Sequence, residues 1–150
     1  MKYTVSLDLD LPRDQLVALY DDPANRPKWQ RGLESATLVS GKEGQPGAVS
    51  NLLFRMGKRE MPMVETIVAK DLPDSVEVAY DAKGVHNVVR TEFVATGPET
   101  TRMDIHNVFE FSGFMKVVGF LAKGAFPRQT RKIMGDFVQF AVHGKDVREA

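Results

Sequence analysis

Apolar and polar side chains alternate without a fault over residues 3–10. A period of two is typical of a β-strand with one buried face. Pro12 and Asp14 come next, and both favour the first turn of a helix. The pair Asp22-Pro23 repeats this start signal, and Pro27 soon ends the second helix. The pattern therefore predicts one strand and then two short helices.

Strands dominate residues 33–111. Short apolar runs, rich in Val, Phe and Thr, are separated there by clusters of turn-forming residues. Successive strands joined by short turns pair antiparallel, so we expect a meander of six strands. The turn signals are Gly41 to Gly47, Gly57-Lys58, Asp71 to Asp74, Asp81 to Gly84, and Gly97-Pro98-Glu99.

Turn lengths also predict which residues lie opposite one another. Opposed residues point to the same face of a sheet, so these pairs define one inner face. Most of that face is apolar, but it also carries Glu65, Tyr80, Asn87 and the pair Thr91 and Asn107. The predicted pairs are Leu52 with Met63, Glu65 with Tyr80, Lys70 with Ser75, Tyr80 with Val85, Thr96 with Arg102, Phe93 with Ile105, Thr91 with Asn107, and Val89 with Phe109.

From Pro127 the period changes to that of a helix. Apolar and small residues recur at spacings of three and four, which places them on one helical face. Gly119, Gly124 and Pro127 predict a broken or kinked start to this helix. The face consists of Phe126, Thr130, Ile133, Phe137, Phe140 and Gly144. The fold class is thus α+β: a seven-stranded curved antiparallel sheet around a long C-terminal helix, with two short helices after strand one.

Composition narrows the class of protein. A chain of 150 residues with 43% hydrophobic and 27% charged residues fits a single globular domain over residues 1–150. Twenty basic residues balance twenty acidic ones, so no overall field would attract nucleic acid. There is no cysteine, and residues 1–10 lack the apolar core of a signal peptide. Residues 111–126 are too short to span a bilayer. We expect a cytoplasmic protein without stable membrane insertion.

Several local patterns make the chain resemble the START-like helix-grip superfamily (SRPBCC), which includes polyketide cyclases/dehydrases and lipid-transfer proteins. The resemblance runs from about Lys2 to Gly144 and implies a cavity between the sheet and the long helix, open near the short helices. The patterns that carry it are Asp22-Pro23 through Trp29, Gly44-Gln45-Pro46-Gly47, Met63-Val64-Glu65-Thr66-Ile67, Asn107-Val108-Phe109, and Gly113-Phe114-Met115.

Glu65 is the strongest candidate for a catalytic acid or base. A carboxyl that projects into an apolar cavity prefers its neutral form and can serve as a general acid or base. Tyr80, on the neighbouring predicted strand, is placed to hydrogen-bond Glu65 or a ligand carbonyl. Alternatively, Glu65 lies hydrated at the cavity mouth or pairs with a cation of the long helix, Arg128 or Lys132.

The remaining polar groups on the inner face would either orient the polar end of a ligand or form hydrogen bonds with one another or with a buried water. Trp29 would line the entrance or cap the core. The three histidines do not converge, so we expect no metal, and no motif indicates a cofactor. The predicted ligand-binding residues are Trp29, Phe54, Met61, Met63, Glu65, Tyr80, Asn87, Val89, Thr91, Asn107, Phe109, Phe126 and Ile133.

Three functions fit this sequence. The first is non-catalytic binding of a hydrophobic or amphipathic small molecule, such as a lipid, isoprenoid, polyketide or aromatic compound. The second is a cyclase-, dehydratase- or isomerase-type enzyme with Glu65 as acid or base and with Tyr80 or Asn107 polarising a carbonyl. The third is an interaction or membrane-surface module that uses the apolar residues 111–126.

Overall fold

The computed structural model describes residues 1–149 and contains one seven-stranded antiparallel sheet of order β1-β7-β6-β5-β4-β3-β2. The strands are β1 (Lys2–Leu9), β2 (Leu33–Ser40), β3 (Val49–Met56), β4 (Arg59–Asp71), β5 (Ser75–Ala82), β6 (Val85–Gly97) and β7 (Thr100–Phe111). The helices are α1 (Arg13–Asp21), η1 (Pro23–Asn25), α2 (Arg26–Trp29), α3 (Met115–Leu121), α4 (Ala125–His143) and η2 (Val147–Glu149). The predicted α+β fold is confirmed.

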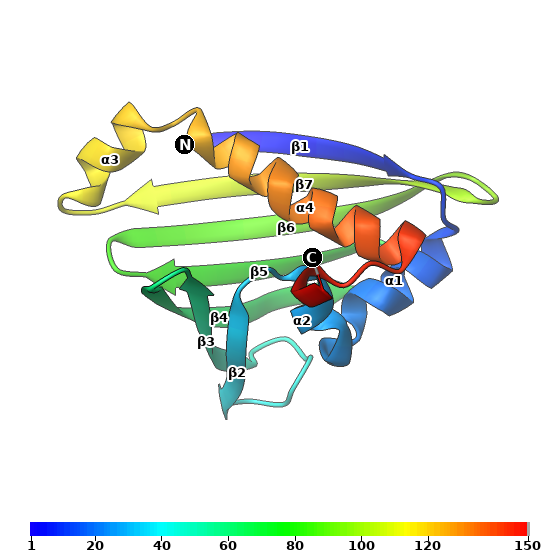
Figure 1. Ribbon diagram of the computed structural model, residues 1–150, viewed down its shortest axis with the longest axis horizontal. Coiled ribbons are helices and arrows are strands. Elements are labelled where there is room, and N and C mark those ends of the chain that lie inside the picture. Colours follow the sequence, from blue (N-terminus) through cyan, green and yellow to red (C-terminus); the bar gives the residue numbers. More distant parts are fainter. Residues whose placement is uncertain (150) are drawn as a thin grey trace.

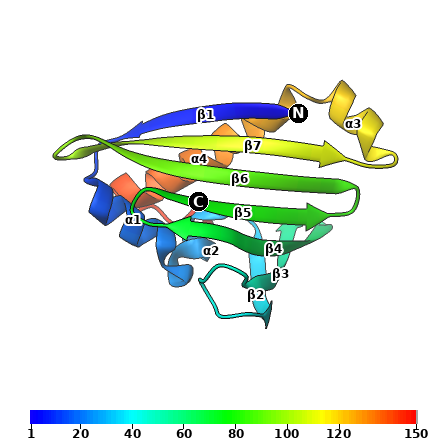
Figure 2. The ribbon, with the colours of Figure 1, turned by 180° about the vertical axis from the view of Figure 1, so that it is seen from behind.

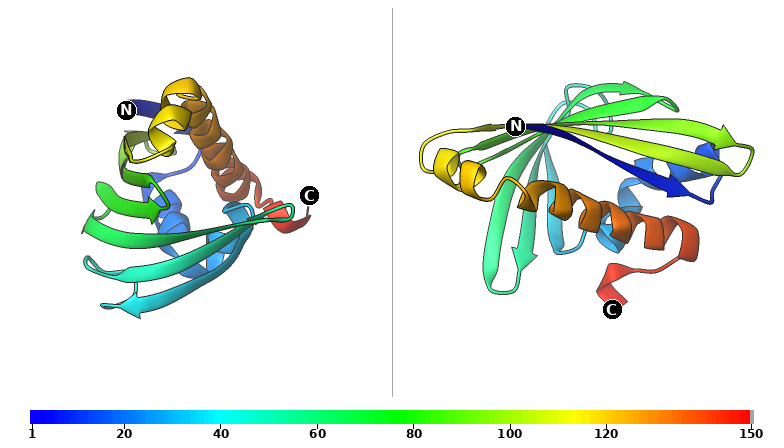
Figure 3. Two further views of the ribbon diagram at one scale, coloured as in Figure 1. Left: turned by 90° about the vertical axis from the view of Figure 1, so that its left-hand side faces the viewer. Right: turned by 90° about the horizontal axis from the view of Figure 1, so that it is seen from above.

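The helices gather on one face of the curved sheet, and the other face is uncovered (Figures 1 and 2). The long helix α4 runs diagonally across the covered face, as the two turned views show (Figure 3). Near the C-terminal end of α4, helices α1 and α2 close the space between β1 and β2. Helix α3 lies at the opposite end of the molecule, past the end of β7.

The strand registers confirm some predicted pairs and correct others. Glu65 lies opposite Tyr80 and Leu52 opposite Met63, as predicted. The loop between β5 and β6 is shorter than predicted, so Tyr80 pairs with Asn87 instead of Val85. An error of two residues leaves every side chain on its predicted face, because side chains alternate with a period of two.

Two β-bulges account for the other differences. One falls between Ile67 and Ala69, so Lys70 pairs with Val76 instead of Ser75, while the pairs farther from the turn are as predicted. The other falls between Ala95 and Gly97. Together with a turn that is tighter than predicted, in which Gly97 pairs with Thr100, this bulge shifts the predicted β6–β7 pairs by two residues, to Phe93 with Met103, Thr91 with Ile105, Val89 with Asn107, and Asn87 with Phe109. Each bulge adds one unpaired residue, which a pattern of apolar positions does not reveal.

The core lies between α4 and the strands β1, β7 and β6. Phe137 of α4 is fully buried against Phe93 and the two aromatic rings of the short helices, Tyr20 and Trp29. The ring centroids of Phe137 and Trp29 are 4.9 Å apart, and those of Phe137 and Tyr20 are 5.5 Å apart, both in edge-to-face geometry. This aromatic cluster fixes the short helices against α4.

A second aromatic group closes the other half of the space beneath α4. The rings of Phe109 and Phe126 lie 4.9 Å apart. The Tyr3 hydroxyl donates to the carbonyl of Phe126 at 3.1 Å and lies 2.7 Å from Thr130 Oγ1. Strand β1 is thereby attached to the first turns of α4.

The break predicted before the long helix is present as the short segment that separates α3 from α4. The far end of α4 is capped by Gly144, which has φ 67° and donates its N–H to the carbonyl of Phe140 at 2.9 Å. Glycine suits this left-handed position because it has no Cβ. Within residues 1–149, no helix has the length and apolar character needed to cross a bilayer.

Candidate functional site

A cavity of about 370 Å³ lies between the short helices and the β2–β5 half of the sheet. Its apolar wall includes Tyr20, Trp29, Leu33, Ala36, Ala48, Ile67, Val76 and Val78. Its charged wall consists of Asp21, Arg26, Glu34, Glu43, Glu65 and Lys70. The cavity opens to solvent beside β2, where Glu34, Leu38 and Glu43 are exposed.

Two local hydrogen bonds help to place Arg26 at this cavity. Asp22 accepts a hydrogen bond from the N–H of Ala24 at 3.0 Å and so caps η1, as the Asp-Pro signal predicts. Asn25 is buried and donates its side-chain N–H to the carbonyl of Leu19 at 3.2 Å, which ties α2 back to α1. The chain therefore enters α2 in a fixed direction, with Arg26 at its first position.

Arg26 and Glu65 form a bidentate ion pair inside the cavity. The two guanidinium N–H groups donate to the two carboxylate oxygens over 3.1 and 2.7 Å. Only 19% of the Arg26 side chain and 10% of the Glu65 side chain are exposed. Two parallel bonds of this kind fix the orientation of both groups. The predicted alternative that Glu65 pairs with Arg128 or Lys132 is therefore wrong, since its partner comes from the short helix α2.

Glu65 also belongs to a row of polar side chains that crosses four strands on the inner face. Ser50, Glu65, Tyr80 and Asn87 are successive cross-strand neighbours on β3, β4, β5 and β6. Neighbours of this kind have their Cβ atoms about 5 Å apart. The middle two, Glu65 and Tyr80, line the cavity together with Ser50.

Burial and the charges in the cavity shift the pKa values of three side chains that line it. Burial raises the pKa of Tyr80 well above 10.0, and the negative charge of Glu65 raises it further. Burial also raises the pKa of Tyr20, with Glu65 adding to the effect. Burial opposes the charge on Arg26, but the Glu65 carboxylate outweighs this and the pKa of Arg26 rises. The cavity thus holds two neutral phenols beside one compensated ion pair.

Lys70 closes the rim of the cavity on the side of the β2–β3 loop. Its ammonium group donates to the carbonyl of Gly44 at 2.8 Å and pairs with Asp21 at 2.7 Å. Strand β4, the loop and helix α1 are therefore joined at one point. Sequence patterns did not single out Lys70 or Arg26, although Arg26 lies inside the stretch from Asp22 to Trp29 that carries the family resemblance.

Of the predicted ligand-binding residues, the cavity brings together Trp29, Glu65 and Tyr80. The others lie elsewhere. Phe54, Met61 and Met63 are on the same face of β3 and β4, and Met63 borders a shallower hollow of about 300 Å³. Val89, Thr91, Asn107 and Phe109 lie on the strands beneath α4, Phe126 packs on Phe109 from the first turn of α4, and Ile133 of the same helix is 40% exposed. Among residues 1–149, the lining side chains come from α1 to β5 and not from α4.

Two amide side chains on the inner face of the sheet each have one buried atom with unused hydrogen-bonding capacity. Within the described residues, Asn87 Oδ1 and Asn107 Nδ2 have no hydrogen-bond partner. Asn107 is 3% exposed, so the prediction that these amides satisfy one another does not hold for these two atoms. The indole N–H of Trp29 is likewise buried and unpaired in residues 1–149.

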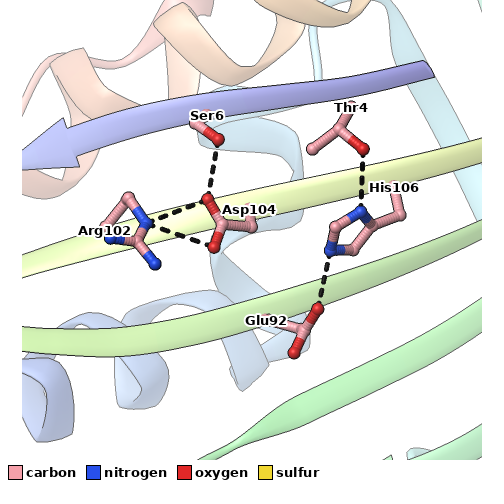
Figure 4. Close-up of polar contacts among 6 residues, drawn as sticks. All are labelled: Thr4, Ser6, Glu92, Arg102, Asp104 and His106. Carbon is pink, nitrogen blue, oxygen red and sulfur yellow. Dashed lines mark hydrogen bonds and ion pairs between the residues drawn. The ribbon is translucent and has the colours of Figure 1, made fainter.

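The uncovered face of the sheet carries a separate polar network (Figure 4). His106 on β7 lies between Thr4 Oγ1, 2.8 Å from Nδ1, and Glu92 Oε1, 2.6 Å from Nε2. Ser6 donates to Asp104 Oδ1 at 2.7 Å. These contacts tie β1, β7 and β6 together on the face opposite the cavity. In residues 1–149, no three acidic or histidine side chains are arranged to hold a metal ion.

Comparisons with known proteins agree with this fold. The family model described as "Polyketide cyclase / dehydrase and lipid transport" matches residues 1–139. A conserved protein from Geobacillus kaustophilus has a similar structure, with TM-score 0.77, 12% identity and 97% coverage of both chains. Truncated norcoclaurine synthase from Thalictrum flavum is also similar, with TM-score 0.72, 15% identity, and coverage of 95% of this chain and 92% of that one. Ara h 8.0201 has TM-score 0.71 and 14% identity, covering 95% and 98%. Among curated proteins, none matches the sequence significantly.

Proposed function

Since the chain belongs to the polyketide cyclase/dehydrase and lipid transport family, we propose that its cavity binds one amphipathic small molecule. The observation that carries this proposal is the combination of an open cavity of about 370 Å³ with a buried, bidentate ion pair fixed in its wall. Pockets for small molecules typically measure about 300–1,000 Å³ and combine apolar walls with a few placed polar groups. The ligand class is a lipid, isoprenoid, polyketide or aromatic compound.

The two kinds of wall suggest how such a ligand lies. Its apolar body would rest on Ile67, Val76 and Val78 of the sheet, beneath the rings of Tyr20 and Trp29. A hydroxyl or carbonyl would face the polar end of the cavity. There the Tyr80 hydroxyl is neutral, so it can donate a hydrogen bond to such a group.

Ligand binding can be followed through Trp29, which is the only tryptophan of the chain and lines the cavity. A ligand that contacts the indole should change its fluorescence, and it should also raise the melting temperature because it binds only the folded state. We would titrate a panel of lipids, isoprenoids and phenolic compounds. No change in fluorescence or melting temperature across the panel would contradict the proposal.

Two variants of one strand give a matched pair for this test. Ala36→Phe adds a ring to the cavity wall, whereas Thr37→Phe adds the same ring to the opposite face of β2. Both residues are exposed on an edge strand, so neither ring has to enter the core. Ala36→Phe should weaken binding and Thr37→Phe should leave it unchanged. Equal binding by both variants would place the ligand outside this cavity.

The contact between Glu65 and Tyr80 favours a second function, an enzyme of the cyclase or dehydratase type. A carboxylate beside a neutral phenol offers a base and an acid in one cavity. The bidentate contact with Arg26 favours the base role for Glu65 over a general-acid role, because both carboxylate oxygens already accept hydrogen bonds from the guanidinium. In an enzyme, Glu65→Gln should bind ligand and lose turnover. Unchanged turnover in this variant would remove Glu65 from the mechanism.

A similar structure suggests two aromatic compounds for the test panel. Norcoclaurine synthase from Thalictrum flavum has been solved in complex with dopamine and hydroxybenzaldehyde, both small aromatic molecules with polar ends. That structure is 17% identical to this chain, with TM-score 0.65, and covers 92% of it. The likeness concerns the fold, so these compounds serve here as members of the test panel.

A further inference from the structure

Four exposed apolar side chains, three of them the most exposed large ones within residues 1–149, lie together on and beside α3, at the end of the molecule remote from α1 and α2 (Figure 1). Phe114 is 78% exposed, Phe120 73%, Leu121 77% and Val117 52%. Their spacing of three and four residues places them on one face of the helix. Exposed apolar groups gathered in this way mark an interaction surface.

The opposite face of α3 packs against the sheet and holds the helix in place. Gly119 is buried so close to the ring of Phe111 that a Cβ at this position would lie 2.6 Å from a ring carbon. A Cβ at Gly84, in the β5–β6 turn, would meet the side chain of Met115 in the same way. The apolar face is therefore presented outward by a supported helix.

The charged residues along this segment of the chain all have one sign. Residues 112–135 contain the five cations Lys116, Lys123, Arg128, Arg131 and Lys132 and no aspartate or glutamate, although the whole chain has no net charge. All five are exposed. The ammonium of Lys123 lies 5.8 Å from the centroid of the Phe120 ring, so this lysine covers part of the ring while its charge remains in water.

We propose that α3 docks the protein on an anionic lipid bilayer. Its apolar face would enter the boundary between headgroups and acyl chains, and the surrounding cations would contact anionic headgroups. A second copy of the chain fits this surface less well, because a two-fold contact would bring the same cations together. This docking does not depend on the cavity, although it would place a lipid-binding protein at the source of its ligand.

Vesicle cosedimentation tests the proposal directly. The protein should sediment with phosphatidylcholine vesicles that contain about 30% phosphatidylserine and much less with pure phosphatidylcholine, and added salt should weaken the binding. The double variant Phe114→Ser, Phe120→Ser should bind about tenfold more weakly or worse, since it removes two rings that would be buried in lipid. Lys116→Glu, Lys123→Glu should also weaken binding.

Matched control variants test whether vesicle binding depends on α3 in particular or on exposed apolar and basic residues anywhere on the surface. Val39→Ser removes an exposed apolar side chain from β2, and Lys42→Glu, Lys145→Glu changes the same charges in the β2–β3 loop and after the end of α4. Both controls should bind vesicles as the unmodified protein does. In a further variant, Phe120→Trp, the new indole emission should shift to the blue when anionic vesicles are added.

Three results would overturn the proposal: no binding to anionic vesicles, full binding by the phenylalanine double variant, or a dimer in analytical ultracentrifugation that this variant disrupts. The cavity is tested separately, because the Ala36→Phe variant should bind vesicles normally. The phenylalanine variant should still bind the small-molecule ligand. Failure of one proposal is therefore distinguishable from failure of the other.

Discussion

Replacing Arg26 with methionine tests the energetic role of the ion pair in the cavity. The substitution keeps a long side chain but leaves Glu65 as a carboxylate that is 10% exposed and has lost its bidentate partner. Removing one partner of a fully buried pair costs about 3–5 kcal/mol. The cavity opens to solvent, which partly rehydrates the carboxylate, so we expect a loss of about 2–3 kcal/mol.

For a chain of this length, that loss corresponds to a decrease in melting temperature of about 4–12 °C. The free energy of unfolding would be measured by urea denaturation, followed by Trp29 fluorescence. The double variant Arg26→Met, Glu65→Leu removes both charges and should be close to the unmodified protein, because an apolar pair is often neutral at a buried site. The losses of unfolding free energy in the single variants Arg26→Met and Glu65→Leu should therefore add up to a value that exceeds the loss in the double variant by about 1.5 kcal/mol or more.

The pair of Arg31 and Asp136 provides a control with similar geometry on the surface. Arg31 donates two hydrogen bonds of 3.2 Å to Asp136, but its side chain is 44% exposed. Arg31→Met should therefore change the unfolding free energy much less than Arg26→Met. If the losses from Arg26→Met and Glu65→Leu simply add in the double variant, the two residues do not act as one ion pair and the reasoning is refuted.

Three other changes test the packing around the site. Burial holds the pKa of all three tyrosines above 10.0, so the folded state keeps protons that the unfolded state loses. The stabilisation from these tyrosines should be complete below pH 10 and should be lost as the pH rises through the raised pKa values. Tyrosinate absorbance that appears before unfolding would contradict this. Phe137→Ala should cost about 3–5 kcal/mol in urea denaturation, because the ring is fully buried in the aromatic cluster, and a loss below about 1 kcal/mol would show that the cluster does not support the fold. Gly119→Ala should lower the melting temperature because its Cβ would collide with the ring of Phe111. Gly124→Ala should not lower it, because the nearest atom to a Cβ there is the end of an arginine side chain 3.8 Å away. Equal effects of the two substitutions would rule out the collision.

The sequence contains enough information to predict the fold and the inner face of the sheet. Alternation with a period of two identifies strands, and the face of Glu65 and Tyr80 can be assigned once a turn is located. Turn lengths and bulges were harder to predict from the sequence. Tyr80, for example, pairs with Asn87 instead of the predicted Val85. Those shifts depend on local backbone geometry, which side-chain polarity does not encode.

The position of the cavity could not be predicted from the pattern, because it depends on how closely the helices approach the sheet. Phe137 and Phe93 fill the space beneath α4, so the cavity lies beside this helix, next to β2. The partner of Glu65 was missed for a related reason. Helical spacing predicted that the long helix carries cations, but only the fold shows that the cation paired with Glu65 is Arg26, at the start of α2.

The most direct test of ligand binding in the cavity is native mass spectrometry of the freshly purified protein and of its Ala36→Phe and Thr37→Phe variants, followed by extraction and identification of any released compound. The cavity proposal predicts one bound small molecule on the unmodified protein and on Thr37→Phe, and a clear loss of that molecule from Ala36→Phe. If no molecule is bound even after incubation with the ligand panel, or if Ala36→Phe binds it as well as Thr37→Phe does, the cavity is not the binding site.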